Sequence, residues 1–224
     1  MQVNVERLIN IFLILMVICL YGIGKQVISL TLIIIYLLIF PLIKQIKSFN
    51  FNTHELLVLA FIGAIAAMLR IPFAMIPSVQ PTTFIIIATA IVIGSQAGFI
   101  IGLLAAFISS LYLGFGIWTV FQMIAWGLAG FYAGFLADTF ILNNVIGRTI
   151  YGFCIGILFG WFMNLSFIIL MIDSIDLEVI LPYFIASFPF DLNHAITNSL
   201  LLFFFSHVWI KFMTYLTKKH RLFK

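Results

Sequence analysis

The sequence predicts an all-α polytopic membrane protein. Of its 224 residues, 64% are hydrophobic and only 8% are charged, a composition typical of chains that cross a bilayer several times. Residues 71–137 contain no Asp, Glu, Lys or Arg, and this run is long enough for three crossings at about 20 apolar residues each. The apolar runs are continuous and do not alternate with polar residues, which favours helices over a transmembrane barrel.

Two apolar runs near the N-terminus predict two transmembrane helices, Leu8–Tyr21 and Val27–Ile43. The stretch Lys44–His54 follows, and it is the internal segment polar enough to act as a linker. We therefore expect two units in the chain: a helix pair with its linker in residues 1–53, and a helical core in residues 54–224.

Six further crossings are expected in the core. Thr53 is the expected N-cap of the first, and Glu55 in its first turn suits the positive end of the helix dipole. Arg70 near the other end is expected to extend towards the membrane surface. Three prolines within residues 72–81 then predict an irregular connection. The expected core crossings are Glu55–Phe73, Thr82–Ile93 (a short one), Ala97–Leu113, Trp118–Ala137, Thr149–Ile172 and Leu181–Lys211.

Small residues mark faces on which helices are expected to pack closely. Ala60, Ala64 and Ala67 recur on one face of the first core crossing. In the segment Gly152–Gly160, every fourth residue is glycine, which gives two overlapping Gly-xxx-Gly steps. Because small side chains let another backbone approach, both faces are predicted to contact a helix. The alanine face could contact a helix of this chain or of a partner.

The distribution of Lys and Arg predicts the orientation. Eight crossings would place both termini on one side of the membrane, while the other side receives Lys25 and the acidic segment Asp173–Glu178. Since positive residues favour the cytoplasm, we expect a multi-pass cell-membrane protein with both termini cytoplasmic. The same placement at helix ends assigns the net charge of +4 to membrane anchoring, with no nucleic-acid partner. The residues on the side of the termini are Lys44, Lys47, Arg148, Lys218, Lys219, Arg221 and Lys224.

Polar and amphipathic side chains from several crossings are predicted to meet at one level, in the outer half of the membrane. Asp191, His194 and Asn198 share one face of the last crossing because their spacings are three and four residues. Ionisable residues inside a membrane are functional-site candidates, and convergence from several helices is typical of a binding pocket. The expected substrate-binding residues are Gln80, Thr83, Trp118, Gln122, Trp161, Asn164, Asp191, His194 and Asn198.

Each of these residues also has a structural interpretation. Asp191 follows a proline and could cap a helix, and His194 could be a buried histidine bonded to the backbone or to Asp191. Asn164 and Asn198 could join helices by hydrogen bonds, and the tryptophans could belong to an interfacial belt. The sequence contains no His-Glu-x-x-His, Gly-x-Ser-x-Gly or phosphate-binding loop, so no metal, cofactor or enzymatic activity is expected.

Four segments of the core resemble a known family. They are Ala60–Ala67, Val79–Thr83, Gly114–Gly130, and Phe188–Ala195 with Asn198. From about His54 to the C-terminus, the chain resembles the substrate-binding S components of energy-coupling factor (ECF) transporters, the bacterial vitamin importers. Within that family the two middle segments are most similar to the cobalamin type. The N-terminal pair of helices lies outside the resemblance.

The resemblance implies a six-helix core that binds a vitamin-sized solute, cobalamin-like, in its outward half. It also implies docking on a separate membrane coupling subunit that works with two ATPase subunits, and Ala60, Ala64 and Ala67 match the family's docking motif. A membrane scaffold protein of cell-wall elongation, which needs no ligand, has a similar hydropathy and is the alternative. An intramembrane enzyme using Asp191 and His194 is a third hypothesis, but no nucleophile or metal set accompanies them.

Overall fold

The computed structural model describes residues 5–22, 24, 28–30, 32, 33, 35–37, 40, 50–171 and 176–223, and these residues contain helices and no β-strand. The predicted all-α class is confirmed. Most of the predicted crossing Val27–Ile43 and of the connector Lys44–His54 lies outside the described residues. The helices are α1 (Val5–Gly22), α3 (Thr53–Arg70), α4 (Thr82–Ile93), α5 (Ser95–Leu113), α6 (Ile117–Phe135), α7 (Val145–Met171) and α8 (Leu177–His220).

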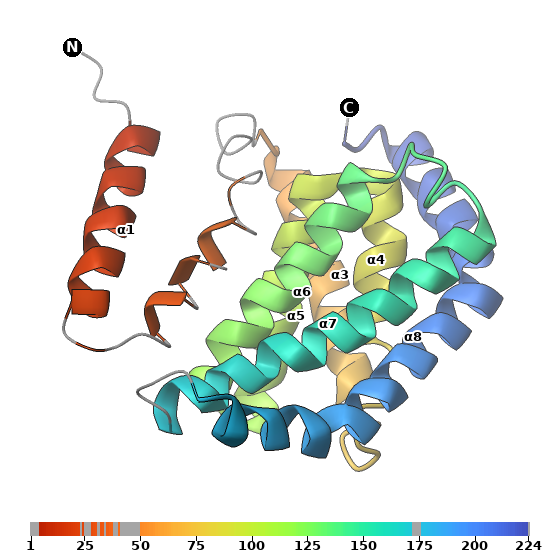
Figure 1. Ribbon diagram of the computed structural model, residues 1–224. Coiled ribbons are helices and arrows are strands. Elements are labelled where there is room, and N and C mark those ends of the chain that lie inside the picture. Colours follow the sequence, from red (N-terminus) through yellow and green to blue (C-terminus); the bar gives the residue numbers. More distant parts are fainter. Residues whose placement is uncertain are drawn as a thin grey trace.

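Helices α3 to α8 form the core, and α1 stands to one side of it (Figure 1). By length and composition, four helices of the described core, α3, α5, α7 and α8, could each cross a membrane. We call the lower end of the core in Figure 1, with the connections 71–81 and 114–116, the distal end. The opposite end, where the described C-terminal residues lie, is the proximal end.

Helix α4 is the centre of the core. Its 12 residues span only about 18 Å at 1.5 Å per residue, which is less than the hydrocarbon thickness of about 30 Å. Residues Thr82–Ala90 are all buried, and α4 contacts each of the other five core helices. Its hydroxyls have partners: Thr82 donates to the Ala66 carbonyl at 2.9 Å, and Thr89 accepts from Trp209 Nε1 at 2.8 Å. These bonds satisfy polar groups that no water could reach.

Helix α3 begins and ends differently from the prediction. Asn52, and not Thr53, is the N-cap, because its side chain accepts from the Glu55 backbone N–H while the Glu55 carboxylate accepts from Asn52 N–H, each at 3.0 Å. This reciprocal pair is a capping box, which requires the acidic residue three positions after the cap. The helix ends at Arg70, three residues before Phe73. Turns and bends occupy most of residues 71–81.

Helices α5 and α6 pack with their backbones almost in contact. A Cβ atom added to Gly98 would lie 2.6 Å from the Gly130 carbonyl oxygen, and one added to Gly102 would lie 2.3 Å from the Trp126 carbonyl oxygen. Only glycine therefore permits this approach. The turn between α4 and α5 also needs glycine, because Gly94 has a φ of +97°.

Helices α7 and α8 form the second closely packed pair, and the predicted packing face of Gly152–Gly160 is confirmed. Added Cβ atoms on its three glycines would meet Leu202, Ala195 and Asp191 of α8 at 2.4 Å or less. Helix α8 begins at Leu177 and reaches His220, so it is longer at both ends than the predicted Leu181–Lys211.

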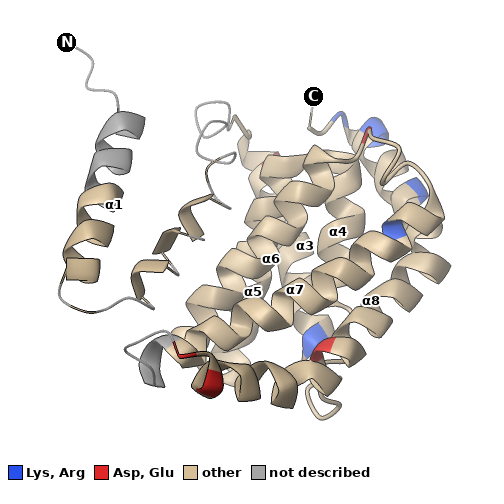
Figure 2. Ribbon diagram, in the orientation of Figure 1, with Lys and Arg blue, Asp and Glu red and all other residues tan. Residues whose placement is uncertain are grey.

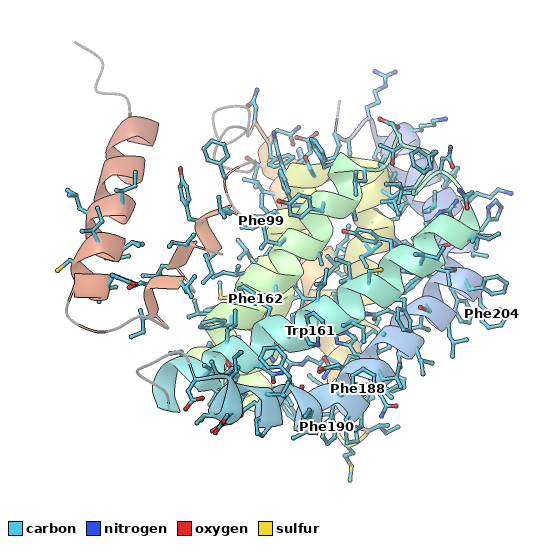
Figure 3. The ribbon with its side chains drawn as sticks, viewed as in Figure 1. Phe99, Trp161, Phe162, Phe188, Phe190 and Phe204 are labelled. Atoms are coloured by element: carbon cyan, nitrogen blue, oxygen red, sulfur yellow. The ribbon has the colours of Figure 1, made fainter. Side chains whose placement is uncertain are left out.

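Two prolines lie inside α8, at positions 182 and 189. The helix first crosses the distal end of the core and then turns to run along its side (Figure 1). Proline removes a backbone hydrogen bond and bends a helix, which accounts for this course. Beyond the bend, Phe204 projects outward from α8, where a lipid environment would receive it (Figure 3).

The close contact of α5 and α6 predicts a large effect from a single methyl group. Gly102→Ala should lower stability by about 1–3 kcal/mol, because its Cβ would meet backbone atoms that cannot rotate away. Thermal unfolding of the purified protein in detergent measures the effect. Gly22→Ala is the matched control, since nothing lies within 4 Å of its added Cβ. Equal unfolding temperatures for the two variants would contradict the close contact.

Candidate functional site

A chain of buried polar and aromatic side chains connects the core helices around the start of α4. Thr83, in the first turn of α4, is completely buried. Its hydroxyl accepts a hydrogen bond from Trp126 Nε1 of α6 at 2.9 Å, and it also lies 2.9 Å from Nε2 of His194 in α8. One hydroxyl thus satisfies two buried ring nitrogens that would otherwise lack partners.

Arg70 joins this chain from the end of α3. It is only 9% exposed, and its Nη1 donates to Ser109 Oγ of α5 at 2.9 Å and to Gln122 Oε1 of α6 at 3.1 Å. Its guanidinium carbon lies 5.0 Å from the centre of a Trp126 ring, within range of a cation–π interaction. The expectation that Arg70 extends towards the membrane surface is therefore wrong: the guanidinium points into the core.

A second polar group links α7 to α8 near the distal end. Asn164 donates to Ser187 Oγ at 2.8 Å, and Ser187 donates to Asp191 Oδ2 at 2.9 Å. Gly160 leaves room for the Asp191 carboxylate, because a Cβ there would clash with it. The proposal that Asp191 caps the helix is wrong, since α8 begins fourteen residues earlier, at Leu177.

Asn198 lies apart from both groups, between α7 and α8. It is completely buried, and its Nδ2 donates to the Gly152 carbonyl at a long 3.4 Å. Its Oδ1 is buried without a hydrogen-bond partner among the described residues. Buried acceptors of this kind are uncommon in proteins and mark a place where a further donor would be favourable.

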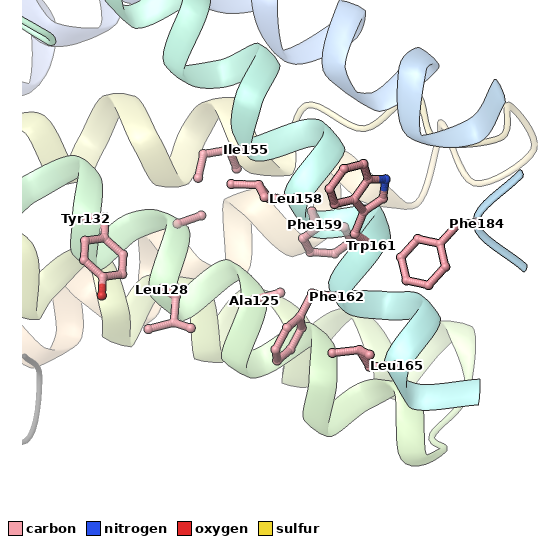
Figure 4. A pocket seen from close by; sticks show the side chains of 11 residues that line it. Ala125, Leu128, Tyr132, Ile155, Leu158, Phe159, Trp161, Phe162, Leu165 and Phe184 are labelled. Carbon is pink, nitrogen blue, oxygen red and sulfur yellow. The ribbon is translucent and has the colours of Figure 1, made fainter. Parts of the chain in front are cut away.

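An apolar groove of about 450 Å³ runs between α6 and α7 and reaches Phe184 of α8 (Figure 4). The volume is within the usual range for small-molecule sites. Trp161 and Phe162 lie on α7 where it approaches the distal end (Figure 3), and both line the groove. The lining residues are Ala125, Leu128, Ala129, Tyr132, Ile155, Leu158, Phe159, Trp161, Phe162, Leu165 and Phe184.

Phe159 forms the boundary between the groove and the buried polar chain. Its ring lines the groove and also lies 5.0 Å from the Trp126 ring and 4.9 Å from the His194 ring, between centres. An aromatic solute in the groove would therefore be one ring away from Trp126. The site combines apolar aromatic walls with a polar chain behind them, an arrangement suited to a flat, partly polar molecule.

The structure divides the predicted substrate-binding residues among several places. Thr83, Gln122 and His194 belong to the buried polar chain, while Asn164 and Asp191 share Ser187. Gln80 is half-buried in the connection 71–81, and Trp118 is exposed at the start of α6, folded over Gly116. Trp161 lines the groove, and Asn198 stands alone.

Three residues of the buried chain were not among the predicted site residues: Arg70, Ser109 and Trp126. The position of Arg70 was a signal, because it immediately precedes the charge-free residues 71–137. A charge beside such a run is expected to face the bundle interior unless it can reach the surface.

The alanine face of α3 is only partly accessible. Ala60 is exposed and Ala64 is half-buried, but Ala67 is 1% exposed and packs inside the core. The docking role of Ala67 stays a prediction, and Ala60 and Ala64 form the accessible part of this face. Leu57 and Phe61 extend the exposed part of this face.

Comparison with known proteins gives one family. The family model described as "ECF-type riboflavin transporter, S component" matches residues 50–208. No curated protein and no solved structure matches the chain. The matched range includes α3 to α7 and most of α8, so it contains the polar chain and the groove.

The double role of the Thr83 hydroxyl predicts that its removal destabilises the core. Thr83→Val keeps the shape of the side chain but leaves Trp126 Nε1 and His194 Nε2 without their partner. We expect a loss of about 1–3 kcal/mol, measured by thermal unfolding in detergent. Thr149→Val is the control, because that hydroxyl only donates to a carbonyl of its own helix. A loss no larger than that of the control would contradict the assigned role.

Proposed function

We propose that this chain captures a flavin-like vitamin for import. The chain belongs to the family of ECF-type riboflavin transporter S components. S components are the substrate-binding subunits of ECF vitamin transporters, and they are not enzymes. The single observation that carries the proposal for this chain is the groove between α6 and α7, whose aromatic walls suit a flat ring system.

The groove favours a flavin over cobalamin as the solute. Five aromatic side chains lie along it: Tyr132, Phe159, Trp161, Phe162 and Phe184. Aromatic rings stack favourably on planar ligands, and a corrin ring with its side groups is much bulkier than a flavin. The family match names riboflavin and gives no support to the cobalamin-type resemblance of the sequence.

The partners follow from the family. ECF S components associate with a membrane coupling subunit and ATPase subunits, and for this chain we propose two ATPases in the complex. The exposed part of α3 around Ala60, Ala64 and Phe61 is the proposed docking face, because its small residues permit close approach of another helix. The cell-wall scaffold alternative, which needs no ligand, receives no support from the family match.

We propose that the distal end faces outward. Figure 2 shows Lys and Arg gathered near the proximal end, where α8 ends in the basic segment Lys218–Arg221. An excess of Lys and Arg on one side favours the cytoplasm. The C-terminus, and with it the N-terminus, would then be cytoplasmic, and solute would approach the groove from the distal side.

Filling the groove should block solute binding. Ala125→Trp adds a large ring to the groove wall, and we expect the dissociation constant for riboflavin to rise at least about tenfold, a cost of about 1.4 kcal/mol. Quenching of flavin fluorescence by the purified protein measures the constant. Val120→Trp adds the same ring at an exposed position of the same helix outside the groove and should leave the constant unchanged.

Two results would contradict this proposal. One is binding of riboflavin with equal affinity by both tryptophan variants, which would place the solute elsewhere. The other is binding of cobalamin but not riboflavin, which would restore the cobalamin-type interpretation.

The docking proposal makes a separate prediction. Ala60→Glu places a carboxylate on the small-residue face of α3 and should abolish co-purification with the coupling and ATPase subunits. Riboflavin binding by the isolated chain should not change, since Ala60 is outside the groove. Ala186→Glu, at an exposed alanine of α8, is the control. Retained co-purification of the Ala60 variant would exclude this face.

A further inference from the structure

We propose that Arg70 binds an electron-rich acceptor edge of the solute, such as a carbonyl oxygen of a flavin ring together with the ring nitrogen beside it. The inference rests on the proposed function. It makes Arg70 a residue that determines which chemical class of solute is bound. Three features carry it: the burial of an unbalanced positive charge, an unsatisfied donor on that charge, and the two aromatic rings that connect Arg70 to the groove.

The charge of Arg70 is not balanced within the described part of the chain. Its side chain is 9% exposed, and no described carboxylate oxygen lies within 4.0 Å of it. A buried charge is costly unless an opposite charge or several hydrogen bonds compensate it. Ser109 and Gln122 provide neutral oxygens to Nη1, and the Trp126 ring provides a weaker attraction. The site is therefore short of negative charge.

The unmet hydrogen-bonding capacity is on the same side chain. Nε of Arg70 is buried and has no hydrogen-bond partner among the residues that the structure describes, although guanidinium is a strong donor. An arginine with paired oxygens before it forms short, charge-assisted bonds with fixed geometry. A solute that brings two neighbouring acceptor atoms would satisfy the free donor and would also reduce the charge imbalance.

The route from the groove to Arg70 passes two aromatic rings. Phe159 lines the groove, its ring lies 5.0 Å from the Trp126 ring, and the Arg70 guanidinium lies 5.0 Å from a Trp126 ring centre. Rotation of the Phe159 side chain would extend the groove to Trp126. A flat solute that replaced Phe159 would then lie against the same ring that the Arg70 guanidinium approaches.

A structural role is the competing explanation, since Arg70 joins α3 to α5 and α6 through its two hydrogen bonds. The Gln122→Glu variant distinguishes the structural explanation from the solute-binding one. The new carboxylate would take the place of an amide oxygen 3.1 Å from Nη1 and would balance the charge within the protein. If Arg70 is purely structural, solute binding is unchanged in this variant. If Arg70 binds the solute, the new carboxylate weakens its attraction for the solute and binding becomes weaker.

The experiment uses the purified full chain and titration with riboflavin, followed by quenching of flavin fluorescence. We expect Arg70→Gln and Gln122→Glu each to raise the dissociation constant at least tenfold. Arg148→Gln is the matched control: Arg148 is also 9% exposed, but it bonds Leu142, Asn143 and Ser206 at the proximal end. It should lower the unfolding temperature without changing the dissociation constant.

The absorption band of the bound flavin gives a second measurement, because a cation beside the ring carbonyls perturbs it. The band should move in Arg70→Gln and stay in place in Arg148→Gln. If Arg70→Gln does not fold, Gln122→Glu decides alone. If a folded Gln122→Glu or Arg70→Gln variant binds riboflavin with wild-type affinity and shows an unshifted band, the role of Arg70 is overturned, while the proposed function stands. Failure of the wild-type chain to bind riboflavin would overturn the proposed function and this inference together.

Discussion

The core depends on one constraint: polar groups away from water must find partners inside the bundle. The first turn of α4 shows how this is met. Thr82 bonds the α3 backbone, and Thr83 serves both Trp126 and His194. These bonds fix α4 against α3, α6 and α8, although α4 is too short to cross a bilayer on its own. The longer helices surround it, and the candidate site lies where they meet its distal end.

The helices themselves were largely predictable, because long apolar runs bounded by polar residues determine where a chain can cross a membrane. Their ends were less so. Thr53 and Asn52 are both good caps, and the choice depends on the position of Glu55 exactly one capping-box spacing after Asn52. The start of α8 was placed four residues late because Asp176 and Glu178 were assigned to an acidic connection, whereas Asp176 is the N-cap of α8 and Glu178 lies in its first turn.

The candidate site was less predictable than the fold. Spacing along one helix gives the depth and face of a residue, but not the rotation of that face relative to its neighbours. His194 and Asn198 share a face of α8, yet one meets Thr83 of α4 and the other meets Gly152 of α7. Arg70 was missed for the same reason: its proximity to a helix end suggested the surface, and only the packing of α5 and α6 around it buries it.

The position of the groove follows from where glycine occurs. Glycine brings the backbones of α5 and α6 together, and likewise those of α7 and α8. Between α6 and α7 the facing residues along the groove include Leu128, Phe159 and Phe162, which hold the two helices apart. Within the core, α5–α6 and α7–α8 are thus two closely packed pairs with a wider seam between α6 and α7. Tyr151 joins the two sides of this seam by donating to the Ala129 carbonyl at 2.8 Å. A solute site at this seam can change shape through side chains such as Phe159 while both glycine contacts stay intact.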